Sequence, residues 1–185
     1  MVIALKDKDK VVVLSTIADV VEDISTYDMA LVGNVPGWKV RGTKDCFVFA
    51  DSVKYAVDLL RCHNGIFKNI TDGNSVIADV VPQMKELLDR YACIYNNREW
   101  DASLVVVKGN KIFTINRYFI VSEVDDFVGV GYDSYLNGAL EESADIPTED
   151  RLMFAVDHVC KMCNKSLFPL VLFDTKSQKR NVIYK

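Results

Sequence analysis

The apolar residues of the chain follow two patterns, short continuous runs typical of strands and spacings of three or four typical of helices. The chain opens with two short runs on either side of a charged KDKDK segment, which predicts a β-hairpin. A second hairpin is predicted around Lys108-Gly109-Asn110. Strands are predicted at 2–5, 11–16, 29–32, 46–50, 103–107, 111–115, 118–121, 127–130, 169–173 and 181–184.

Helical spacing occupies four other segments of the chain. They are 53–60, 77–95, a short helix that starts near Asp133, and 147–163. Asp51 or Ser52 is suited to cap the first of these helices. Ile77 falls on the predicted buried face of the second helix, and Met162 or Cys163 on that of the last. The order is strands, two helices, strands, two helices, strands. It predicts an α+β fold of packed antiparallel sheets with helix pairs outside.

Composition narrows the class of protein. The 185 residues include 22 Lys+Arg and 26 Asp+Glu, and half of them are hydrophobic, which predicts one globular domain over residues 1–185. The sequence contains no block of Lys and Arg that would predict a nucleic-acid surface. No apolar run reaches the roughly 20 residues that span a bilayer. We expect a cytoplasmic protein without leader or pro-segment, because a predicted strand begins at residue 2 and the five cysteines suit a reducing compartment.

Six segments carry a resemblance to a known family. They are VIALKDKDKVVVLS at the start, GNVPGWKVRG, CFVFADSVKYAVDLLR, ASLVVVKGNKIFTI, FVGVGYDSYLNGALEE and AVDHVCKMC. Their order resembles that of the proteasome β-subunit and the bacterial HslV-type peptidase, both N-terminal-nucleophile hydrolases. The resemblance implies a four-layer αββα sandwich whose subunits assemble in stacked rings.

The resemblance also implies a set of catalytic positions. In the family, an N-terminal threonine attacks the peptide bond with its own α-amine as base. A buried lysine, two aspartates and a Gly-Ser-Gly turn support it. These positions fall on Met1 for the nucleophile, Ile17 and Lys161 for the aspartates, Lys39 for the lysine, and Val130 for the serine. Only Lys39 keeps the family residue type.

The replacements predict that the threonine-peptidase chemistry is lost. Methionine has no hydroxyl or thiol, and removal of Met1 would expose Val2, which has neither. Ser15 and Thr16 could become terminal only if the backbone were cut, which would remove the first strand. We therefore expect a catalytically silent proteasome-like subunit that forms a homo-oligomeric ring, or that partners an ATPase or an active homologous subunit.

Three alternatives stay open at this stage. An active N-terminal-nucleophile endopeptidase would require a mature chain that begins with Thr, Ser or Cys. A scaffold of the proteasome α-subunit type would carry an N-terminal helix, whereas this chain starts with a strand. An unrelated α+β binding protein would share only the order of its elements.

No cofactor or metal is expected. Cys160-Lys161-Met162-Cys163, with His158 nearby, has the form of a metal half-site. A zinc site needs about four ligands, and the sequence offers no second Cys-x-x-Cys motif. Two cysteines three residues apart on a helix are better explained by packing against the core.

Overall fold

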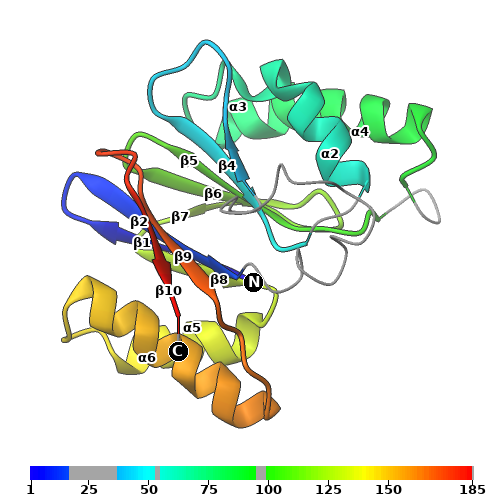
Figure 1. Ribbon diagram of the computed structural model, residues 1–185. Helices are drawn as coiled ribbons and strands as arrows, with labels where there is room; N and C mark the ends of the chain where they lie inside the picture. The colour runs from blue at the N-terminus through cyan, green and yellow to red at the C-terminus, as the bar shows by residue number, and fades with distance from the viewer. Residues whose placement is uncertain (17–36, 53–54, 95–98, 185) are drawn as a thin grey trace.

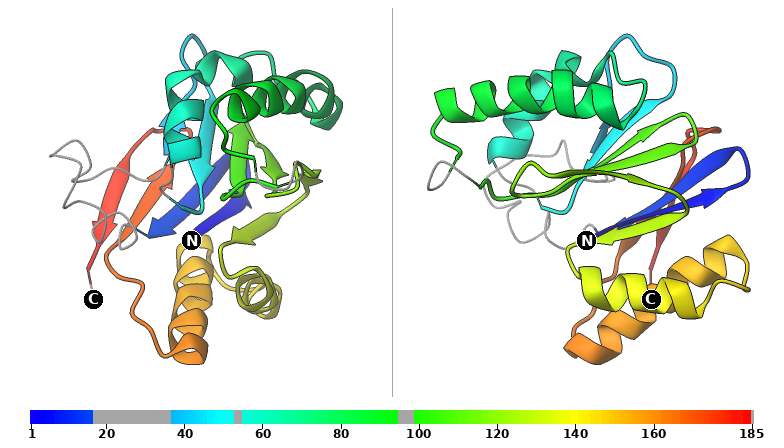
Figure 2. Two further views of the ribbon diagram at one scale, coloured as in Figure 1. Left: turned by 90° about the vertical axis from the view of Figure 1, so that its right-hand side faces the viewer. Right: turned by 180° about the vertical axis from the view of Figure 1, so that it is seen from behind.

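The computed structural model describes residues 1–16, 37–52, 55–94 and 99–184. Its strands form two antiparallel five-stranded sheets that lie face to face, with helices on both outer faces (Figures 1 and 2). The predicted α+β class and the predicted sandwich architecture are confirmed. No helix within these ranges has the length and apolar character needed to cross a membrane.

Each sheet consists of five hydrogen-bonded strands. The first runs β10 (Arg180–Ile183), β9 (Leu170–Asp174), β2 (Lys10–Thr16), β1 (Val2–Asp7), β8 (Phe127–Val130). The second runs β3 (Gly37–Lys39), β4 (Cys46–Ala50), β5 (Leu104–Lys108), β6 (Lys111–Ile115), β7 (Val121–Val124). Strands β7 and β8 follow each other along the chain and lie in different sheets, so the chain crosses between the sheets at this edge.

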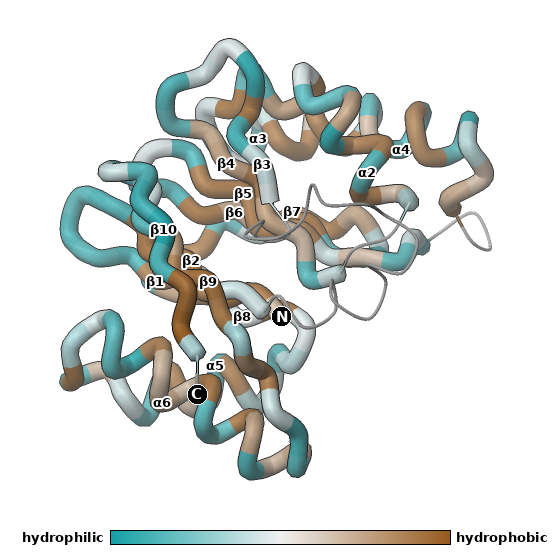
Figure 3. The backbone as a smooth tube through the Cα atoms, viewed as in Figure 1, coloured by the Kyte–Doolittle hydropathy of each residue, from teal (hydrophilic) through white to brown (hydrophobic). Residues whose placement is uncertain are grey.

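Three apolar layers hold the sandwich together. The first lies between the second sheet and the segments α2 (Tyr55–Cys62), η1 (Asn64–Phe67), η2 (Val76–Val80) and α4 (Val81–Arg90). The short helix α3 (Gly73–Ser75) has no buried residue. Another layer lies between the sheets, and the last between the first sheet and helices α5 (Asp133–Glu142) and α6 (Thr148–Cys163). Apolar strands and helix faces therefore lie inside, as Figure 3 shows.

The helix predicted over 77–95 differs from the structure. It begins at Gly73 behind a capping box formed by Asp72 and Ser75, and it ends at Arg90. Its second segment, η2, is a π-helix, whose wider turn changes the angular position of side chains. Ile77 is consequently 55% exposed, and its predicted burial is wrong.

Smaller differences concern single elements. Of the two residues predicted for the last position of the buried face of α6, Met162 is 57% exposed and Cys163 packs against the core. The strand predicted at 118–121 lies at 121–124, because Phe119 has a left-handed φ of 63° in a turn. Strand β3 was not predicted, since Pro36-Gly37 has the sequence of a turn. The strand predicted at 29–32 lies outside the described residues.

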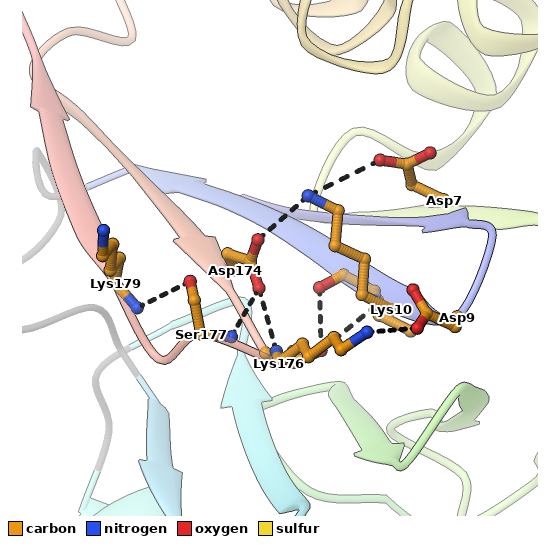
Figure 4. A network of polar contacts seen from close by, with 9 residues as sticks. Asp7, Asp9, Lys10, Asp174, Lys176, Ser177 and Lys179 are labelled. Atoms are coloured by element: carbon orange, nitrogen blue, oxygen red, sulfur yellow. Dashed lines mark hydrogen bonds and ion pairs between the residues drawn. The ribbon is translucent and has the colours of Figure 1, made fainter.

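A polar network fixes the turn between β9 and β10 (Figure 4). One carboxylate oxygen of Asp174 accepts hydrogen bonds from the backbone N–H groups of Lys176 and Ser177, both at 2.9 Å. The other lies 2.9 Å from Lys10 Nζ. Burial alone would raise the pKa of Asp174, but the Ser177 and Lys10 hydrogen bonds outweigh it and hold the pKa at about 2.

Asp174→Asn tests this network. A carboxylate whose pKa falls from 3.8 to about 2 on folding stabilises the folded state when it is ionised. The stabilisation is complete above about pH 5 and disappears as the pH falls through 4 toward 2. We expect Asp174→Asn to lower the free energy of unfolding by about 1–2 kcal/mol at pH 7 in urea titrations, and by less at pH 3.

Asp9→Asn is the matched control, because Asp9 pairs with Lys176 at the exposed side of the same network. Exposed ion pairs contribute little to stability, so its urea midpoint should stay near that of the wild type. An Asp174→Asn effect that is equal at pH 7 and pH 3 would contradict the proposed charge contribution.

Candidate functional site

Met1 lies at a buried corner where the ends of β1, β2 and β8 meet. The residue is 2% exposed, and its side chain belongs to the core beneath α5 and α6. Its α-amino nitrogen donates to Thr16 Oγ1 at 3.3 Å and to the carbonyl oxygen of Asp51 at 3.2 Å. The position that the resemblance assigns to the nucleophile is thus occupied by an apolar side chain packed into the interior.

Val130 lies next to this corner. It is the register partner of Val2 on β1, and its side chain packs in the layer between the two sheets. The next residue, Gly131, has a left-handed φ of 96°, and a Cβ there would lie 3.1 Å from Met1 Cα. The backbone of this turn therefore approaches Met1 so closely that a side chain at Gly131 would be crowded.

Asp51 is a member of the corner that sequence reasoning considered only as a helix cap. One of its carboxylate oxygens accepts the Ser103 N–H at 2.9 Å. Burial raises the pKa of Asp51, although the Ser103 hydrogen bond and the positive charge at Met1 act in the opposite direction. Asp133 adds a second carboxylate nearby, which accepts the Gly131 N–H at 2.8 Å. Asp51 follows β4 and Asp133 begins α5, so two acids distant in sequence lie near this corner and no local pattern joins them.

Two hydroxyl side chains complete the corner, and both are buried. Ser15 Oγ donates to the carbonyl oxygen of Met1 at 3.3 Å. Thr16 Oγ1 accepts from the Met1 α-amino group, and the Thr16 N–H donates to the Met1 carbonyl at 3.2 Å. Ser15 is 0% and Thr16 3% exposed. Both hydroxyl groups thus lie out of solvent and pair with the polar backbone of Met1.

Lys39 lies away from this corner. Its pairing partner on β4 is Phe47. The contact with Met1 is made by Asp51, which follows Phe47 by four residues. That separation is about 13 Å in an extended strand. The Lys39 side chain is exposed, and its Nζ donates to Gln178 Oε1 at 3.2 Å.

The remaining family-equivalent positions are placed as follows. Lys161 lies in the last turn of α6 and is exposed. Ile17 lies outside the described residues. Cys160 and Cys163 pack at the edge of the core beneath α6. The structure thus brings Met1 and Val130 together with Asp51, Ser15 and Thr16, and it does not bring Lys39 to them.

Several solved structures share this fold. A scan of protein-family models and a search of curated protein sequences found no match. Solved structures do match: BPH from Thiobacillus denitrificans superposes with a TM-score of 0.68 at 14% identity, over 94% of this chain and 96% of that one. A second BPH structure is a complex with epoxomicin.

Two further structures share the fold. HslV from Trypanosoma brucei has a TM-score of 0.61 at 14% identity, over 94% of this chain and 97% of that one. Anbu, an ancestral β-subunit, from Yersinia bercovieri has a TM-score of 0.64 at 14% identity, over 100% and 87%. The chain therefore has the sandwich fold of HslV-like and Anbu proteins. The resemblance to the HslV-type fold that the sequence indicated is confirmed.

Gly131→Ala tests the close approach at the corner. The added Cβ would meet the Met1 backbone at 3.1 Å, and alanine disfavours the φ of 96°. We expect a loss of about 1–3 kcal/mol in the free energy of unfolding, measured in urea. Gly138→Ala is the matched control, because a Cβ there meets nothing within 4 Å and lies in helix α5. That change should stabilise the protein by about 0.5–1 kcal/mol, and equal effects at both glycines would contradict the crowding at Met1.

Proposed function

We propose that the chain is a proteasome-like subunit without threonine-peptidase activity, which acts as a self-assembling structural or regulatory component in the cytoplasm. The burial of Met1 is the single observation that carries this proposal. A hydrolase of this kind needs a hydroxyl or thiol and a free α-amine facing substrate. At the equivalent corner, a thioether is packed in the core and the amino nitrogen is engaged by Thr16 and Asp51.

The surroundings of Met1 support the same proposal. A lysine that assists the nucleophile must lie within a few ångströms of it for its charge to matter. Lys39 instead contacts Gln178 beside the β9–β10 turn. Val130 stands where the family has a serine, and its apolar side chain packs in the core between the sheets. The cytoplasmic location is supported by five cysteines that are all free.

A second candidate is an active N-terminal-nucleophile endopeptidase whose mature chain begins with Thr, Ser or Cys. The fold shared with HslV and with the epoxomicin-bound BPH favours it. The two candidates differ in the first residue of the mature protein and in turnover, and both can be measured on one preparation.

Peptide hydrolysis separates the candidates. We expect purified protein to release no fluorophore from a panel of fluorogenic peptides above the rate of a heat-treated sample. Its intact mass should correspond to a start at Met1 or Val2 and stay unchanged after incubation with epoxomicin. Turnover that tracks the protein through purification, together with a mass that starts at Thr, Ser or Cys, would establish the endopeptidase instead.

Assembly gives an independent test. Tyr55, Ile77, Tyr118, Ile120 and Met162 are apolar side chains more than half exposed, and such residues suit repeated contacts between copies. Native mass spectrometry at micromolar concentration should show a closed multiple of the 20.9 kDa chain. We expect Ile120→Asp and Met162→Asp each to reduce this mass, whereas a wild-type protein that stays at 20.9 kDa would refute self-assembly.

A further inference from the structure

A cavity of about 580 Å³ lies beside helices α2 and α4, which cover the second sheet (Figure 1). Three separate parts of the chain line it: the turn between β3 and β4, the segment from the end of α2 to the residue after η1, and one face of α4. Each part contributes one cation, in that order Arg41, Lys68 and Arg90. The fold therefore gathers cations that are distant in sequence around one opening.

Positive charge exceeds negative charge in the lining of this cavity. Among the described residues that line it, Glu86 is the one acid, and it forms an ion pair with Arg90 at 2.9 Å. The lining therefore holds no carboxylate that would balance Arg41 and Lys68. The whole chain has a formal net charge of −4, so the cavity differs in sign from the protein as a whole. A local excess of positive charge in a concave site attracts anions.

The Lys68 ammonium group lies against the turn that carries Arg41. A Cβ placed on Gly42 would be 3.6 Å from Lys68 Cε and 4.0 Å from Lys68 Nζ. Gly42 has a left-handed φ of 81°, which glycine adopts without steric cost, and its lack of a side chain leaves space beside the ammonium group. An anion in this space can interact with the charges of Lys68 and Arg41 at the same time.

Asn64 connects two of the segments that line the cavity. Its side-chain oxygen accepts the Arg41 N–H at 3.1 Å, and its side-chain nitrogen donates to the Arg61 carbonyl at 3.1 Å. The Asn64 side chain thus joins the turn between β3 and β4 to the last turn of α2. The backbone that carries Arg41 is therefore in place before a ligand arrives, which reduces the entropy lost on binding.

The lining also limits the chemistry of the anion. The Arg41 guanidinium group suits the paired oxygens of a phosphate, and Lys68 provides a second charge that a single carboxylate would leave unbalanced. No phenylalanine, tyrosine or tryptophan is among the described lining residues, so a nucleobase would lack an aromatic face on which to stack. The volume lies within the range of about 300–1,000 Å³ that is typical of sites for small molecules.

We propose that this cavity binds a small polyphosphate, that is, a compact molecule with at least two phosphate groups and no nucleobase. Its phosphates lie between Arg41 and Lys68, and the Glu86–Arg90 pair forms the opposite side of the site. The cavity is lined by none of the residues of the Met1 corner. The proposal is consequently independent of the proposed function and of any peptidase activity.

Inorganic pyrophosphate tests the proposal, because it carries two phosphate groups and nothing else. Its binding to the purified full chain is measured by isothermal titration calorimetry at constant ionic strength. We expect saturable binding of pyrophosphate, and acetate should bind at least about tenfold more weakly. Arg41→Gln and Lys68→Gln should each weaken pyrophosphate binding by about tenfold, with unchanged circular dichroism. Lys44→Gln is the matched control, because Lys44 is exposed in the same turn as Arg41 and does not line the cavity.

Cys62 provides an independent measure of where pyrophosphate binds. It is exposed and lines the cavity, whereas Cys163 packs at the core beneath α6. We expect saturating pyrophosphate to slow the alkylation of Cys62 by iodoacetamide and to leave that of Cys163 unchanged, as measured by peptide mass spectrometry.

Four results would overturn the proposal. Pyrophosphate could show no saturable binding, or Lys44→Gln could weaken its binding as much as Arg41→Gln does. Alkylation of Cys62 could be unaffected at saturating pyrophosphate, which would place the binding elsewhere. A short single-stranded DNA could bind more tightly than pyrophosphate, which would indicate a nucleic-acid surface instead of a site for a small molecule.

Discussion

Both faces of the central strands of each sheet are buried, and this constraint determines where polar chemistry can occur. Residues along β1, β2, β4 and β5 are buried one after another, because each strand contacts the opposite sheet on one side and helices on the other. A polar side chain in the middle of such a strand would lose its hydration without a partner. Polar groups are therefore confined to strand ends and sheet edges. The Met1 corner lies at one such strand end.

The same constraint explains how much of the fold the sequence predicts. A strand buried on both faces is a continuous apolar run, so Cys46–Ala50 and the runs at the start of the chain are recognisable without any tertiary information. Helices α5 and α6 are equally clear, because a single apolar face packs on the first sheet. Strand β3 could not be predicted, since its three residues gain their regular conformation from pairing with β4 rather than from their own composition.

The sequence predicts less of the site than of the fold, because the contacts that form the site join segments far apart in the chain. The place of Val130 beside Met1 follows from the pairing of β1 with β8, which a resemblance in element order is enough to imply. The role of Asp51 depends on a hydrogen bond from Ser103 and on contact with the Met1 amino group. Both connect segments about fifty positions apart. Ile77 shows the same limit within a helix, because a π-turn changes which residues face the core.

The Met1 corner also shows how an apolar residue at this position adds to the packing of the core. An active nucleophile must remain accessible, so it leaves part of its surroundings unpacked, and such sites usually reduce stability. Methionine has a flexible, apolar side chain that fills irregular space in a core. Here it joins the layer that contains Leu136 and Leu140, and full burial of such a side chain contributes about 1.5–3 kcal/mol. The polar backbone of Met1 is satisfied at the same time by Ser15 and Thr16. A hydroxyl or thiol residue in place of Met1 would lose this packing and would also require new polar partners, so we expect the corner to act as a fixed structural element.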